Sequence, residues 1–177
     1  MANRIILIPI IALTTLFGYN SLAAQNIPDW VLQDNKNTPG ILNKDVTQAN
    51  IATTVCKSGW TATIRPTVTY TNKLKLDQLK TTYKTLTLTF GVDPSKYEED
   101  HLISLQLGGN PSDPKNLWPQ PYAGNNARKK DVVETALKRL VCSGKMKLAD
   151  AQKAILNWPD AYKKYVTSAD SADTSDN

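Results

Sequence analysis

Asp100 and His101 are neighbours in the sequence, and His101 is the only histidine among the 177 residues. An imidazole can accept a proton from water near neutral pH, so this histidine is a candidate general base. A carboxylate beside it can bind a hard divalent cation through oxygen. One histidine and two cysteines are too few for the usual catalytic zinc centres, or for an iron–sulfur cluster held by this chain alone.

Amide and basic side chains follow this pair in a defined order. Asn116 comes after a Gly108–Gly109 turn, and Asn126 follows before a run of basic residues at Arg128, Lys129 and Lys130. Each part has an ordinary alternative: an Asp-His pair is usually a surface hydrogen bond, two glycines a turn, and a basic run a solvated helix face. Their joint order and spacing favour a functional site.

The order resembles the HNH motif of the His-Me finger (ββα-metal) endonucleases, in which two strands and a helix clasp one divalent metal. The resemblance implies that His101 is the general base, Asp100 a metal ligand and Asn116 a brace for the loop. A wider pattern over roughly residues 39–158 is similar to a group of secreted bacterial HNH-like proteins. It comprises Pro39-Gly-Ile-Leu-Asn, Val46-Thr-Gln, Cys56-Lys-Ser-Gly-Trp60, Arg65-Pro66, Glu99-Asp-His-Leu, Leu107-Gly-Gly, Asn116-Leu-Trp-Pro, Lys130-Asp, Glu134, Val141-Cys-Ser-Gly and Ala151-Gln.

In that family the last metal ligand lies on the helix and is often a histidine. This chain has no histidine besides His101 to fill that position. Asn126 is the candidate, because it lies two helical turns before Val133 and projects from the same face. Asn125 lies about 100° away on the helix and could instead cap it. Ligation by Asp100 and Asn126 favours Mg²⁺, with Mn²⁺ or Ca²⁺ as alternatives.

The function predicted from these residues is metal-dependent hydrolysis of phosphodiester bonds in DNA or RNA, with DNA favoured over RNA. Arg128, Lys129 and Lys130 are the predicted phosphate-binding residues, since basic side chains contact the backbone without reading sequence. One alternative is a non-catalytic secreted binding protein on a degenerate HNH scaffold. Another is a glycan hydrolase using Glu98, Glu99 or Asp100, although adjacent acids in one strand point to opposite faces.

The elements that must position these residues predict an α+β fold. Alternating Thr, Val, Ile and Tyr over 51–70, and Leu and Thr over 85–90, predict a strand-rich N-terminal half. Leu74, Leu76 and Leu79 predict a short helix between these strands. His101 should end one strand of the ββα motif and Asn116 should begin its partner.

An antiparallel helix pair is expected to complete the fold. Apolar residues at Val133, Ala136, Leu137, Leu140 and Val141 predict a helix over 126–142 that packs across both strands. The second helix, 148–157, must end before Pro159.

The ends of the chain predict export. Arg4, an apolar run over 5–17 and small residues to Ala24 are typical of a signal peptide over 1–24, cleaved after Ala23 or Ala24. The mature protein is then secreted or periplasmic. Residues 25–38 are predicted to form a loosely attached arm, 39–166 a single domain and 167–177 a disordered tail.

Charge and cysteine content agree with these expectations. The net charge of +5 becomes +4 when residues 1–24, with one arginine and no acid, are removed. This mild excess suits a polyanionic partner without requiring one. Outside the cytoplasm the two cysteines are expected to form a Cys56–Cys142 disulfide.

Overall fold

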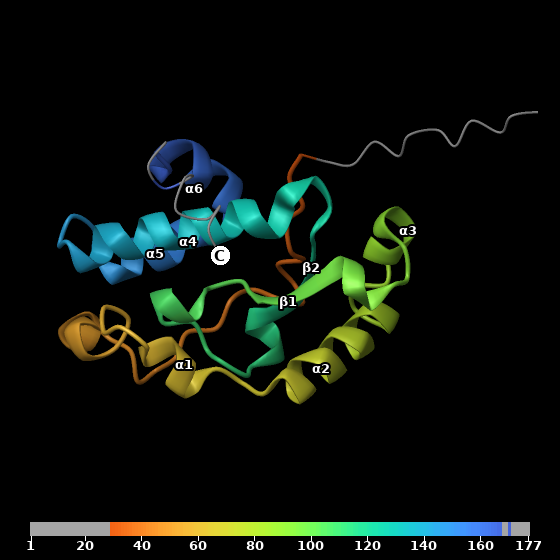
Figure 1. Cartoon of the computed structure of the whole chain (residues 1–177), viewed down its shortest axis with the longest axis horizontal. Helices are drawn as coiled ribbons and strands as arrows, with labels where there is room; N and C mark the ends of the chain where they lie inside the picture. Colours follow the sequence, from red (N-terminus) through yellow and green to blue (C-terminus); the bar gives the residue numbers. More distant parts are fainter. Residues whose placement is uncertain (1–28, 168–169, 171–177) are drawn as a thin grey trace, which may run out of the picture.

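A two-stranded antiparallel hairpin lies at the centre of the computed structural model, which describes residues 29–167 and residue 170. Strand β1 (Tyr97–His101) pairs with β2 (Leu117–Pro121), so that Tyr97 lies opposite Pro121 and His101 opposite Leu117. His101 therefore ends the first strand, as predicted, whereas Asn116 was expected to begin the second strand and lies one residue before it. In Figure 1 the hairpin lies between α4 on one side and α2 on the other.

The sequence of β2 disfavours a further strand along its outer edge. Pro119 and Pro121 alternate along β2, so both sit where a backbone N–H would point away from β1. Leu102 N–H donates to Asn116 O at 2.8 Å. Because hydrogen-bonded pairs alternate in an antiparallel ladder, Trp118 and Gln120 are the residues of β2 that face β1 with their backbone N–H groups. The outer edge of β2 therefore lacks donors at two positions and is a poor template for a third strand.

Three helices form one side of the molecule: α4 (Asn126–Cys142), α5 (Leu148–Ile155) and α6 (Trp158–Tyr165). The predicted helix over 126–142 is confirmed, and Val133, Ala136, Leu137 and Val141 are buried as expected. The second predicted helix ends at Ile155, two residues early. Pro159 does more than stop a helix, because it lies in the first turn of α6, which was not predicted.

The N-terminal half is helical, and the prediction of strands over 51–70 and 85–90 is wrong. It contains η1 (Gln48–Thr53), α1 (Trp60–Ile64), α2 (Val68–Lys80) and α3 (Leu86–Phe90). The threonines that suggested strands bond to their own helices: Thr63 Oγ1 donates to Trp60 O at 2.7 Å, and Thr67 Oγ1 accepts from the Tyr70 N–H at the start of α2. The helix predicted around Leu74–Leu79 is confirmed as part of α2. The fold is thus a mixture of helix and strand, but it is not strand-rich.

Helix α2 braces the hairpin from the side opposite α4. Lys75 Nζ donates to Tyr97 O at 3.0 Å, and Gln78 Nε2 donates to Leu117 O at 2.9 Å, so one helix binds the backbone of both strands. Tyr70 Oη donates to Ser112 O at 2.5 Å in the loop between the strands. Four further short helices connect these elements: η2 (Pro94–Lys96), η3 (Leu105–Leu107), η4 (Pro114–Asn116) and η5 (Ala123–Asn125).

The described part of the predicted arm packs against the core and is not loosely attached. Trp30 meets Trp158 edge to face with ring centroids 5.2 Å apart, and Val31 is buried. Thr38 is fully buried and accepts a hydrogen bond from Tyr83 Oη at 2.6 Å. The aromatic side chains and the buried polar bond supply the anchoring that a polar, turn-rich segment did not suggest.

The ends of the chain are described only in part. The predicted signal peptide and residues 25–28 lie outside the described residues. Of the predicted tail, Thr167 and Asp170 are described, and Asp170 is buried with its carboxylate 3.0 Å from Arg139 Nη2. Within residues 29–167, no helix is long and apolar enough to cross a membrane.

The predicted disulfide is confirmed. Cys56, which follows η1, is bonded to Cys142 at the end of α4, and no other cysteine remains. The bond joins the N-terminal helical region to the long helix beside the hairpin.

Candidate active site

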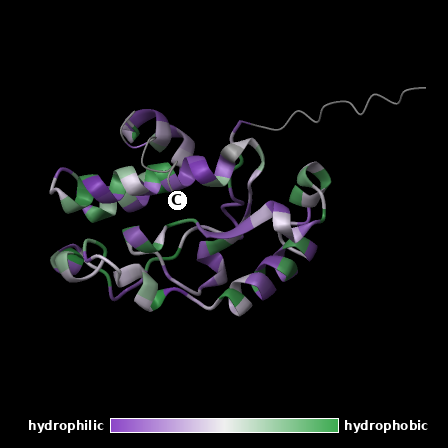
Figure 2. Ribbon diagram, in the orientation of Figure 1, coloured by the Kyte–Doolittle hydropathy of each residue, from purple (hydrophilic) through white to green (hydrophobic). Residues whose placement is uncertain are grey.

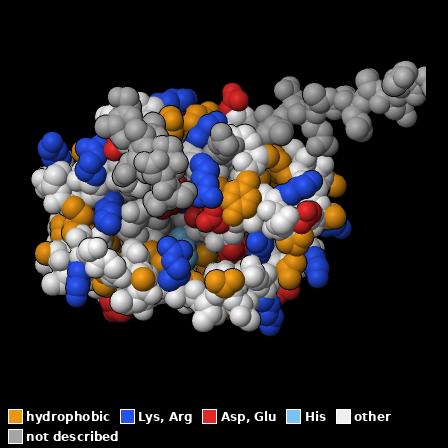
Figure 3. Space-filling view, viewed as in Figure 1, with side chains coloured by type: hydrophobic (Ala, Val, Ile, Leu, Met, Phe, Trp, Pro, Cys, Tyr) orange, Lys and Arg blue, Asp and Glu red, His pale blue; other side chains and the backbone are white. Residues whose placement is uncertain are grey.

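The hydrophilic strand β1 supplies the proposed base of the candidate site and two of its carboxylates. Figure 2 shows β1 as hydrophilic along its length, although it lies at the centre of the molecule. Glu98, Asp100 and His101 line a cavity of about 220 Å³, together with residues from the end of α1, the loop after β1 and the inner face of α4. Figure 3 shows the only histidine, in pale blue, in a hollow beside a group of carboxylates. A polar strand is stable here because it faces a polar cavity.

The ring of His101 is oriented by a backbone carbonyl. Its Nε2 donates to Pro111 O at 2.8 Å, which assigns the proton of the neutral ring to Nε2 and leaves the lone pair on Nδ1. Among the described residues, Nδ1 has no hydrogen-bond partner. Burial lowers the pKa of His101, and the Pro111 carbonyl and Asp100 only partly oppose this effect. The ring is therefore neutral near pH 7 and can accept a proton at Nδ1.

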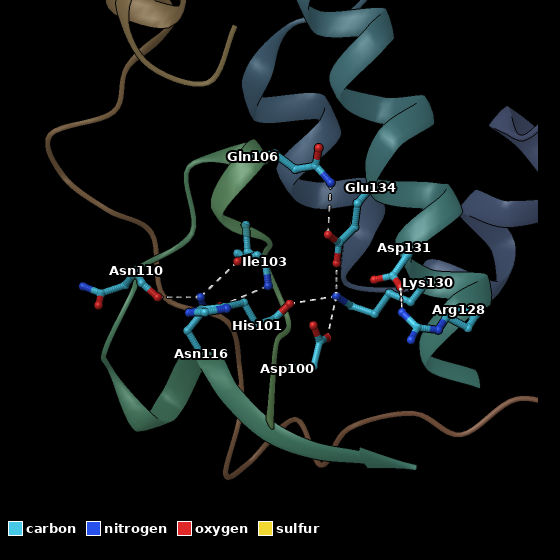
Figure 4. A network of polar contacts seen from close by, with 10 residues as sticks. All are labelled: Asp100, His101, Ile103, Gln106, Asn110, Asn116, Arg128, Lys130, Asp131 and Glu134. Carbon is cyan, nitrogen blue, oxygen red and sulfur yellow. Dashed lines mark hydrogen bonds and ion pairs between the residues drawn. The ribbon is translucent and has the colours of Figure 1, made fainter. Parts of the chain in front are cut away.

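Asn116 closes the loop that carries His101. It is fully buried, its Oδ1 accepts from the Ile103 N–H at 3.0 Å, and its Nδ2 donates to Ile103 O and Asn110 O at 3.0 and 2.9 Å. Figure 4 shows Asn116 between Asn110 and Ile103, with its contacts to both drawn as dashed lines. This is the bracing position expected of Asn116.

Gly109 allows the loop to approach this brace. A Cβ atom at Gly109 would lie 1.7 Å from Ile103 O and 2.8 Å from Asn116 Nδ2. Any side chain there would displace the backbone that Asn116 holds. The glycine is required by close approach rather than by turn geometry.

The side chain of Lys130 is buried beside Asp100. Lys130 is fully buried, and its Nζ donates to His101 O at 2.7 Å and to Glu134 Oε1 at 2.5 Å. The same Nζ lies 2.7 Å from Asp100 Oδ2, an ion pair whose angle is outside that of a hydrogen bond. Burial disfavours the ammonium, but Asp100 and Glu134 raise the pKa of Lys130 above its ordinary value. Lys130 is therefore charged and not exposed to a phosphate.

The two glutamates of β1 differ in their surroundings. Burial raises the pKa of Glu98 to about 6, and Asp100 and Asp131 add to this effect. Burial also raises the pKa of Glu99 to about 9, and both of its carboxylate oxygens are buried without a hydrogen bond. Glu98 lines the cavity, whereas Glu99 does not. Glu98 and Glu99 are therefore not placed to act together on one bond.

Asn126, the predicted second metal ligand, serves a different purpose. It is fully buried, its Oδ1 accepts from the Val31 N–H at 2.7 Å, and its Nδ2 donates to Ala123 O at 2.6 Å. It ties the N-terminal segment to the start of α4 and does not line the cavity. The side chain of Asn125 lies outside what the structure describes.

The residues as they lie do not fit the expected divalent metal. Asp100 is paired with an ammonium group, and the oxygen of Asn126 is bound to a backbone N–H. Across the described chain, no three His, Cys, Asp or Glu side chains converge as a metal site would require.

The other two predicted phosphate-binding residues, Arg128 and Lys129, do not line the cavity. Arg128 is exposed and forms an ion pair with Asp131 at 3.3 Å. Lys129 lies over the Trp30 ring at 4.6 Å, away from the cavity.

Two basic residues that the sequence did not single out for phosphate binding line the cavity instead, Arg65 after α1 and Lys138 on α4. Neither side chain has an ion-pair partner within residues 29–167. Lys138 lies two helical turns after Asp131, which helix periodicity could have revealed. Arg65 lies in a segment predicted to be strand, and no local pattern connects it to His101.

Comparison with known proteins gave no match to any family model, any curated protein or any solved structure.

Proposed function

We propose that the protein hydrolyses phosphodiester bonds in nucleic acid, with DNA as the first substrate to test. The observation that carries this proposal is His101, a neutral imidazole with an oriented ring and a free Nδ1 in a polar cavity. The sequence resemblance to HNH endonucleases agrees with it. The proposal assigns His101 the role of general base.

In the proposed reaction, a water molecule gives a proton to His101 Nδ1 while its oxygen attacks the phosphorus. The bond from phosphorus to the leaving oxygen then breaks, and that oxygen takes a proton from solvent. A buried base with a lowered pKa is suited to this step because it stays unprotonated near neutral pH.

Two basic side chains at the cavity are left without an ion pair among the described residues. Lys130 pairs with Asp100 and Glu134, and Arg128 pairs with Asp131. Because Lys130 offsets only one of its two carboxylate partners, Arg65 and Lys138 offset the other one and Glu98, and the formal charges balance. These two side chains are the proposed phosphate contacts.

A second candidate function is a non-catalytic secreted binding protein. The absence of a histidine on the helix and the pairing of Asp100 with Lys130 both favour it. It predicts nucleic-acid binding without cleavage.

Nicking of a supercoiled plasmid by the purified mature protein separates these functions. Each reaction is run with EDTA and with added Mg²⁺ or Mn²⁺, and a labelled RNA is tested in parallel. We expect cleavage by the wild type and a loss of about 10²–10⁴-fold in His101→Gln. Lys163→Ala, an exposed substitution on α6, is the matched control and should cleave normally.

Equal cleavage by His101→Gln would place the activity elsewhere or in a contaminant. Binding without cleavage by the wild type under every condition would establish the second candidate.

A further inference from the structure

Lys130 forms the centre of a charge cluster that the sequence resemblance does not describe. Its ammonium contacts a carboxylate oxygen of Asp100, one of Glu134 and the backbone carbonyl of His101. Figure 4 shows the three oxygens around one nitrogen, between β1 and α4. Gln106 Nε2 donates to the second oxygen of Glu134 at 3.2 Å, so this carboxylate is held from two sides.

The cluster requires a cation for physical reasons. Lys130 is fully buried, and the Asp100 and Glu134 side chains are only 14% and 9% exposed. Two carboxylates this close repel each other in a medium that screens charge weakly, and a positive charge between them removes the repulsion. A divalent metal performs this task in many hydrolases, but here an ammonium group occupies the position.

We propose that Lys130 is the resident cation of this centre and replaces the divalent metal that the resemblance implies. Lys130 is a positioning residue: it holds Asp100 and Glu134 together and binds the carbonyl of the residue whose ring is the proposed base. The centre is therefore assembled, and His101 oriented, without a metal ion. The assembly itself does not depend on nuclease activity, whereas the metal-free reaction rests on the proposed function.

A metal between Asp100 Oδ2 and Glu134 Oε1 would have to displace the ammonium. Ca²⁺ and Mg²⁺ bind carboxylate oxygens at about 2.0–2.6 Å, and the Asp100 oxygen that would bind one already lies 2.7 Å from Nζ. Removal of the lysine side chain should change this, because it leaves two carboxylates around an empty volume. Lys130→Ala should therefore gain a divalent-cation site that the wild type lacks.

The first experiment measures thermal unfolding with EDTA and with millimolar Mn²⁺ or Ca²⁺. The wild type should keep one Tm in all buffers. Lys130→Ala should unfold at a lower temperature in EDTA and recover part of the loss with Mn²⁺ or Ca²⁺. Lys130→Met, which fills the volume, should be destabilised without recovery. Lys138→Met, a cavity lysine without ion pairs, is the matched control and should resemble the wild type.

The second experiment remains informative if both Lys130 variants fail to fold. Calorimetric titration of the wild type with Mn²⁺ should show no binding. Mn²⁺ binding by the wild type that is lost in Asp100→Ala would overturn the proposal. A wild-type Tm that rises with Mn²⁺ and loses this response in Asp100→Ala would overturn it too.

The pKa of His101 provides a readout that a purely structural lysine would not move. Lys130 is one of the charges that lower this pKa, so Lys130→Met should raise the NMR titration midpoint of the only histidine. An unchanged midpoint in a folded Lys130→Met protein would contradict the positioning role.

Cleavage assays separate the two proposals. Cleavage that persists in EDTA and is lost in His101→Gln supports both. Cleavage that requires a metal and also depends on His101 retains the proposed function and overturns this inference. A wild type that never cleaves, yet shows the expected Tm behaviour, retains the role of Lys130 and rejects the nuclease.

Discussion

His101 combines a buried ring, one oriented nitrogen and one free nitrogen, and this combination gives it a defined titration. Burial disfavours the imidazolium, whereas Asp100 favours it. In a tag-free protein, NMR titration of this single histidine should give a midpoint below the ordinary 6.5. Asp100→Asn should lower the midpoint further, because it removes the charge that stabilises the protonated ring. A midpoint above 6.5 in the wild type would show that an acceptor stabilises the protonated form of Nδ1, so that this nitrogen is not free.

Glu99 is expected to make the stability of the protein depend on pH. Its pKa of about 9 in the folded state exceeds the ordinary 4.5, so the folded protein holds a proton that the unfolded chain releases between these values. The free energy of unfolding should therefore fall as pH rises from about 5 toward 9, by up to about 1.4 kcal/mol per pH unit. Glu99→Gln should remove most of this slope.

Urea unfolding at several pH values measures this difference. Glu98→Gln is the matched control, because the pKa of Glu98 is about 6 and its contribution to the slope should end near that pH. Equal slopes above pH 7 in Glu99→Gln and the wild type would mean that Glu99 is ionised in the folded protein.

Some of the candidate site follows from sequence, because neighbouring residues on one strand or helix have predictable positions. His101 ends β1 beside Asp100, and Asn116 directly precedes β2, close to the strand positions predicted for them. Lys130 was predicted to bind phosphate, but it is buried, because Glu134 one turn later and the Asp100 carboxylate of β1 surround its ammonium group. Arg65 could not be found, since only the tertiary fold brings it to the cavity.

At the scale of elements, the wrong predictions are the strands over 51–70 and 85–90, which are threonine-rich segments that form helices. Alternating Thr and β-branched residues fit a strand, but β-propensity mainly reflects packing on a sheet face, and the sheet of the described residues has only two strands to offer one. Pro66 and Thr67 contain the better signal, a cap directly before α2. The long amphipathic helix α4 was predictable because its apolar period extends over several turns.

The loop between β1 and β2 gives a prediction about an element. Gly109→Ala should lower the free energy of unfolding by at least about 3 kcal/mol, because its Cβ would lie 1.7 Å from Ile103 O. Gly59→Ala is the control: Gly59 has φ of +73° with no atom within 4 Å of a new Cβ, so only backbone strain of about 1–2 kcal/mol applies. Urea unfolding measures both. Equal losses would mean that the loop can shift without cost.

At the scale of the whole molecule, the disulfide joins the two sides that enclose the hairpin. Cys56 and Cys142 are separated by 86 residues, and closing a loop of this size stabilises a fold by on the order of 4 kcal/mol. Replacing both cysteines with alanine should cost a similar amount in guanidinium unfolding. A reductant should destabilise the wild type and leave the double variant unchanged, and equal sensitivity in both would contradict the expectation.

The same disulfide affects what happens when a protease cuts the chain. Every residue that lines the candidate site lies between Cys56 and Cys142. A protease that cuts the chain once within this span produces two fragments that remain covalently joined, so the packed halves are not free to diffuse apart. Such a nicked molecule should migrate as one species in a non-reducing gel and as two after reduction. The centre around His101 thus belongs to a covalent ring, and a single cut opens this ring without separating the two fragments.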